Sequence, residues 1–153
     1  KYPTRCVEQI VEIVKRAEKY AGLGYEKELA AQGDKQHVAV HAVALAESLH
    51  AVGIIVITRR GIMADLVTNA RPHSVPIFAF ANSSQVRKRL VLNRSVHTFQ
   101  IPFSRNPDKT LSRATKMLKQ IHQFQAQDKV VVVSDVLADS PSDAIQIRPL
   151  GGL

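Results

Sequence analysis

The 153-residue chain is poor in cysteine, in aromatic side chains and in long apolar runs. It has one cysteine, Cys6, no tryptophan, and an aromatic content of 5%. A single cysteine cannot form an intrachain disulfide and is typical of proteins from a reducing compartment. The longest apolar runs, such as 53–57 and 130–133, are far shorter than the roughly 20 residues that a membrane-spanning helix needs. The sequence therefore predicts neither a disulfide framework nor a membrane partner.

Acidic residues are fewer than basic ones, and the formal net charge is +8. Clustered Lys and Arg side chains bind phosphate backbones, but the compact basic groups are only Arg59-Arg60 and Arg87-Lys88-Arg89. No helix-turn-helix, zinc-finger spacing or aromatic stacking platform accompanies them, so we expect no nucleic-acid partner. His37 and His41 form an i, i+4 pair without a third ligand at useful spacing, so no metal site is expected.

What the sequence does contain is an alternation of helical and strand patterns. Apolar residues at three- and four-residue steps predict helices over 4–19, 36–51, 61–70, 83–92 and 107–124. Short apolar runs, rich in β-branched residues, predict strands over 54–57, 75–80, 96–101 and 130–134, with a further strand over 144–148. The first four runs lack strict alternation, which is typical of strands buried on both faces. The sequence thus predicts a three-layer α/β fold, with a mainly parallel five-stranded sheet, helices on both faces and one extra N-terminal helix.

The turn after the first predicted strand is the main candidate for a binding site. Thr58-Arg59-Arg60-Gly61 would lie at the carboxyl end of a strand and at the N-terminus of a helix, where anionic ligands gather. A threonine hydroxyl, a glycine that allows close approach and two guanidinium groups suit a phosphate or a carboxylate. A plain strand-to-helix turn with solvated arginines explains the same residues, because the spacing matches no glycine-rich phosphate loop. Both interpretations stay open at this point.

The segment "VITRRGIMADLVTNARPHSVPIFAFANSSQVRKRLVLNRSVHTFQI" resembles the C-terminal domain of pyruvate kinase. That family has a strand, a Thr-x-Ser-Gly-x-Ser/Thr loop, a helix ending in Arg-Pro, a strand, and an Arg-x-Leu-x-Leu pattern before the next strand. The matching positions here are Thr58, Gly61, Arg71-Pro72, Arg89-Leu90, Leu92 and Val96.

The N-terminus resembles the same family. Lys1-Tyr2-Pro3, followed by Val7 and Ile10, is similar to the Gly-x-Tyr-Pro-x-x-Ala-Val segment that opens its last barrel helix. The resemblance implies a last barrel helix over 1–20, a connector over 21–36 and the α/β domain over 37–153.

The resemblance implies a regulatory and subunit-assembly domain. The parent enzyme transfers phosphate from phosphoenolpyruvate to ADP with Mg²⁺ and K⁺, using residues of a barrel that this chain lacks. We therefore expect no catalytic residue, cofactor or metal in the chain, and an inactive isolated chain. The implied partners are its own catalytic barrel, further copies in a tetramer, and a phosphorylated effector. The alternative is a stand-alone protein that binds an anion or phosphometabolite with the same fold.

The compartment implied by the resemblance is the cytoplasm. Any targeting segment would precede Lys1, so an organelle stays open.

The family's effector loop corresponds here to Thr58, Arg59, Arg60, Gly61, Ile62 and Met63. Arg60 replaces a serine, Ile62 a residue that is often arginine, and Met63 a serine or threonine. The segment 135–143, "DVLADSPSD", has three aspartates and no basic residue, so it would repel a bisphosphate. We expect the usual fructose bisphosphate site to be lost or altered, and the turn to hold one simple anion weakly.

Overall fold

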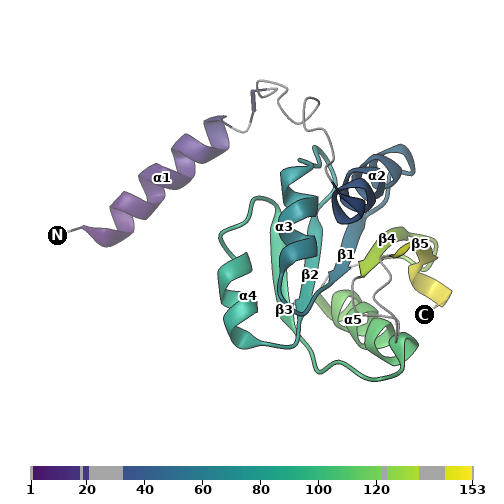
Figure 1. Ribbon diagram of the computed structural model, residues 1–153. Coiled ribbons are helices and arrows are strands. Elements are labelled where there is room, and N and C mark those ends of the chain that lie inside the picture. Colours follow the sequence, from purple (N-terminus) through teal and green to yellow (C-terminus); the bar gives the residue numbers. More distant parts are fainter. Residues whose placement is uncertain (1, 18, 21–32, 122–123, 135–143, 153) are drawn as a thin grey trace. The chain divides into compact units, whose positions relative to one another are not determined.

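The computed structural model describes residues 2–17, 19–20, 33–121, 124–134 and 144–152 (Figure 1). The chain forms two compact units, Lys1–Ala30 and Ala31–Leu153. Most of the predicted connector, 21–32, and the whole aspartate-rich segment, 135–143, lie outside the described residues. None of the helices within the described ranges combines the length and the apolar content that a membrane-spanning helix requires.

The first unit contains one amphipathic helix, α1 (Pro3–Ala17), close to the predicted span of 4–19. Its proline stands at the first helical position, where a missing N–H costs nothing. Val7, Ile10, Val11 and Val14 form an apolar stripe, yet they are 40–59% exposed. No residue of α1 is buried. The helix therefore presents an apolar stripe that its own unit leaves open to solvent.

The second unit is a single mixed sheet with helices between its strands. Its elements are α2 (Asp34–Ser48), β1 (Gly53–Ile57), α3 (Ile62–Asn69), β2 (Ile77–Ala81), α4 (Ser84–Leu90), β3 (Val96–Gln100), α5 (Pro107–Ile121), β4 (Lys129–Ser134), β5 (Ala144–Pro149) and the 3-10 helix η2 (Leu150–Gly152). The strand order is β3-β2-β1-β4-β5. The first four strands are parallel and β5 is antiparallel to β4. This confirms the α/β fold with a mainly parallel five-stranded sheet.

The two faces of β1 supply two separate cores. Ile54 and Val56 belong to a cluster with buried side chains of α2, α3 and α4. Ile55 and Ile57 belong to a second cluster with Leu111 and other buried residues of α5. Because successive strand residues point to opposite faces, a strand covered on both sides must be apolar throughout. Helices therefore cover both faces of the sheet, three on one and α5 on the other.

One strand departs from the expected burial. The apolar run at 96–101 predicts a strand buried on both faces, but β3 lies at the edge of the sheet and exposes His97 and Gln100. The prediction was wrong because a run of apolar residues does not reveal the place of a strand in its sheet. An edge strand has a neighbouring strand on one side only. Its side chains are therefore less completely covered, and polar residues are tolerated there.

Gly53 opens β1 at a position with no room for a side chain. A Cβ atom there would lie 2.2 Å from Cε2 of Phe78, a buried ring on the neighbouring strand. We expect Gly53→Ala to lower the free energy of unfolding by about 1–3 kcal/mol, because overpacking forces the ring to move. Urea denaturation measures the loss. In a Phe78→Leu background the loss should shrink, and equal losses in both backgrounds would contradict this account.

Candidate functional site

The predicted turn lies between the central strand β1 and helix α3, at the carboxyl edge of the sheet. The Thr58 N–H donates to the carbonyl of Phe80 over 3.0 Å, which continues the hydrogen bonding between β1 and β2. The buried Thr58 hydroxyl accepts a hydrogen bond from the Gly61 N–H, also over 3.0 Å. Thr58 therefore closes the turn, and its hydroxyl is already occupied as an acceptor.

Gly61 is the N-cap residue of α3, with φ of +83° in the left-handed region. Residues with a Cβ atom rarely adopt this backbone conformation, which explains why a glycine stands here. The first amides of a helix have no acceptor within the helix, so they and the helix dipole favour an anion just beyond Gly61.

The other residues of the predicted site divide between solvent and core. Arg59 and Arg60 are exposed, Ile62 is half-buried and Met63 is fully buried in the cluster beneath α2 and α3. Met63 therefore packs in the core, where a serine or threonine would contribute little to the hydrophobic packing. The accessible groups at the turn are the two arginine side chains and the backbone.

A third arginine, which the sequence did not place in the site, reaches the turn from α4. Arg89 Nη2 donates to the carbonyl oxygen of Arg60 over 2.8 Å and to Asp65 Oδ2 over 3.0 Å. The other carboxylate oxygen of Asp65 accepts from Asn93 Nδ2 over 2.8 Å. Arg89 and Asn93 lie 24 and 28 residues from Asp65, so no local motif signals the contact. Only the packing of α4 beside α3 could have revealed it.

The charged side chains around the turn are two exposed arginines and one ion pair. The side chains of Arg89 and Asp65 are 55% and 39% exposed, so their ion pair contributes no more than about 1 kcal/mol. Asp65 also stands in the first turn of α3, where its carboxylate offsets part of the positive helix end. Arg59 and Arg60 are therefore the exposed cationic side chains of the turn outside this ion pair.

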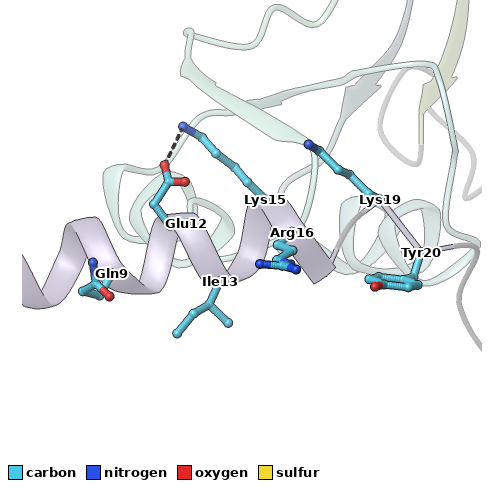
Figure 2. Close-up of a pocket in the computed structure, with 7 residues that line it drawn as sticks. All are labelled: Gln9, Glu12, Ile13, Lys15, Arg16, Lys19 and Tyr20. Atoms are coloured by element: carbon cyan, nitrogen blue, oxygen red, sulfur yellow. Dashed lines mark ion pairs between the residues drawn. The ribbon is translucent and has the colours of Figure 1, made fainter.

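Two hollows lie elsewhere on the described residues. One, in the first unit, is lined by Gln9, Glu12, Ile13, Lys15, Arg16, Lys19 and Tyr20 (Figure 2). Figure 2 shows the Glu12–Lys15 ion pair, 3.5 Å long, on the side of the helix away from Ile13. The second, of about 220 Å³, is lined by His73, Ser74, Val75, Pro76, Ser95 and His97. Across the described residues, no three His, Cys, Asp or Glu side chains gather into a group that could hold a metal ion.

The strand order, the crossover helices and the turn define a doubly wound α/β domain whose candidate site lies at the carboxyl edge of the sheet. Residues 36–147 match the family described as pyruvate kinase, alpha/beta domain. The chain belongs to this family, which confirms the resemblance seen in the sequence.

Individual relatives agree with the family match. The chain is 36% identical over 123 residues to pyruvate kinase isozyme G, chloroplastic, of Ricinus communis, covering 77% of this chain and 28% of that protein. It is 33% identical over 96 residues to pyruvate kinase isozyme A, chloroplastic, of Nicotiana tabacum. This match covers 63% of this chain and 16% of that protein. A crystal structure of a pyruvate kinase from Cryptosporidium parvum has a similar fold, with a TM-score of 0.70 and a sequence identity of 23%. The match covers 79% of this chain and 23% of that chain. The chain thus spans less than a third of each of these proteins.

Replacing Gly61 tests the geometry of the turn. A Cβ atom at Gly61 would lie 2.3 Å from Arg89 Nη2, and φ would stay at +83°. We expect Gly61→Ala to cost about 1–2 kcal/mol of unfolding free energy from the left-handed backbone alone, and more from the contact with Arg89. Denaturant titration should give a smaller loss in an Arg89→Ala background, because the contact with the Arg89 side chain is removed. Stability equal to that of the unmodified chain would refute this description of the turn.

Proposed function

We propose that this chain is the C-terminal regulatory and subunit-assembly domain of a pyruvate kinase, whose catalytic part transfers phosphate from phosphoenolpyruvate to ADP. The observation that carries the proposal is the family match over 36–147, in a chain that spans less than a third of its relatives. The runner-up is a stand-alone protein that binds an anion or phosphometabolite with the same fold. The sequence encoded upstream of Lys1 separates the two, since only the first requires a catalytic barrel there.

The amphipathic helix α1 supports a catalytic barrel as the partner. Its stripe of Val7, Ile10, Val11 and Val14 is exposed, and a helix with such a stripe is stabilised mainly by packing on another apolar surface. We assign residues 1–20 to the last helix of that barrel and 37–153 to the α/β domain. We place the Mg²⁺ and K⁺ sites of the enzyme in that barrel.

Two further features support a regulatory and assembly role. The turn of Thr58 to Met63 combines two exposed arginines with a helix N-terminus, which favours one anionic group of an effector. At the other side of the sheet, β5 is an edge strand with Ile147 48% exposed. Exposed edge strands pair readily with another chain, so this edge suits the homo-oligomer proposed for the enzyme, a tetramer.

We propose the cytoplasm as the compartment of the enzyme. Two of the relatives named above are chloroplastic proteins, which makes a plastid the competing compartment. Imaging of the complete gene product with a fluorescent fusion decides between the two.

The isolated chain should not transfer phosphate from phosphoenolpyruvate to ADP. Phosphoryl transfer needs carboxylate-held metal ions and cationic clamps in one pocket, and the described residues provide no such cluster. A coupled assay for pyruvate measures the rate with the purified chain and with the complete gene product. We expect turnover from the complete product alone. Turnover by the chain that survives removal of contaminating enzyme would refute the assignment, and an inactive complete product would favour the runner-up.

The turn should bind a simple anion weakly. We expect phosphate to bind with a Kd of about 1 mM or weaker, because the helix end and each exposed arginine contribute no more than about 1 kcal/mol. Arg60→Ala should weaken binding about fivefold, while Arg105→Ala, an exposed arginine outside the turn, should leave it unchanged. Isothermal titration calorimetry measures each Kd. Submicromolar binding of fructose bisphosphate that Arg60→Ala abolishes would show that the replaced hydroxyls are not needed.

A further inference from the structure

The turn between α4 and β3 exposes two large apolar side chains next to each other. Leu92 is 89% exposed, the highest value among the large apolar residues that the structure describes, and Val91 is 57% exposed. Leu90, immediately before them, is fully buried in the core cluster. Single exposed leucines are common on protein surfaces, whereas neighbouring exposed apolar side chains form a small contiguous patch that a partner can cover. We call Val91 and Leu92 the apolar turn.

Hydrogen bonds hold the apolar turn in one shape. The Leu92 N–H donates to the carbonyl of Arg89 over 3.3 Å, and the Asn93 N–H donates to the carbonyl of Leu90 over 3.1 Å. The Asn93 side chain is fixed to Asp65 Oδ1 over 2.8 Å. Because the backbone is held on both sides, the two apolar side chains stay directed outward at little entropic cost on binding.

The rim of the apolar turn is basic. Arg87 and Lys88 precede it on α4. A second copy of the chain would meet this patch through a two-fold contact and would bring like charges together. The charge therefore selects a partner with carboxylates around an apolar pocket.

The small size of the apolar turn selects a tethered partner. Free proteins form stable complexes by burying roughly 1,200 Å² or more in total, which two side chains cannot supply. A partner joined through the same polypeptide has a high effective concentration, so a small patch suffices. We propose that Val91 and Leu92 dock into a carboxylate-rimmed apolar pocket on the catalytic part of the same subunit. This inference rests on the proposed function.

Amide hydrogen exchange tests the docking in the complete gene product. We expect the amides of 91–95 to exchange about tenfold more slowly there than in the 153-residue chain, and Leu92→Ser to remove this protection. Ile121→Ser, which changes another side chain that is 55% exposed, should leave the protection intact. The unfolding midpoint of the 153-residue chain should not change with Leu92→Ser, which excludes a folding defect.

The other outcomes separate the alternatives. Equal exchange in the chain and in a complete product that transfers phosphate would overturn the docking and leave the proposed function standing. A complete product without phosphate transfer would overturn both. Protection that rises with the concentration of the 153-residue chain and is lost in Leu92→Ser would identify a second copy as the occupant, and the docking proposal would be wrong.

Discussion

The burial of the central strand β1 is the constraint on which the rest of the domain depends. All five of its residues are buried, and its side chains divide between two separate cores. A strand of this kind is stable only when helices cover both faces of its sheet, and parallel neighbours require crossover connections to supply those helices. The crossovers place the turn after Ile57 at the carboxyl edge and bring α4 beside α3. The candidate site is therefore a consequence of how the core is covered.

The sequence predicted the parts of the fold that local patterns encode. β-branched runs such as 54–57 and 130–133 identified the inner strands, because a strand buried on both faces has no polar position. Helix periodicity located α1, α2 and α5 to within a few residues. The edge position of β3 was not predictable in this way, since the order of strands in a sheet depends on contacts between segments distant in sequence.

The candidate site likewise has parts that local sequence patterns reveal and parts that depend on contacts between distant segments. Thr58 and Gly61 were recognised because a strand-to-helix turn has a local signature, and both shape the turn through one hydrogen bond. Arg89 was missed because it approaches from another helix, 29 residues after the Arg60 carbonyl that it contacts. Met63 was read as a lost phosphate ligand, yet its burial shows a positive reason for an apolar residue there. Sequence reasoning identified the backbone of the site, whereas the surrounding side chains required the structure.

One carboxylate connects the two surfaces of interest in this domain. Asp65 accepts from Arg89, which also holds the carbonyl of Arg60 in the turn, and from Asn93, which belongs to the segment that carries Leu92. Asp65 is partly exposed, so these bonds are individually weak, but they act on three segments at once. The segment from α4 to Asn93 is thus linked to the start of α3 by polar contacts, while Val86 and Leu90 of α4 pack in or against the core. The shape of the turn from Thr58 to Met63 and that of the apolar turn therefore depend on the same side chain.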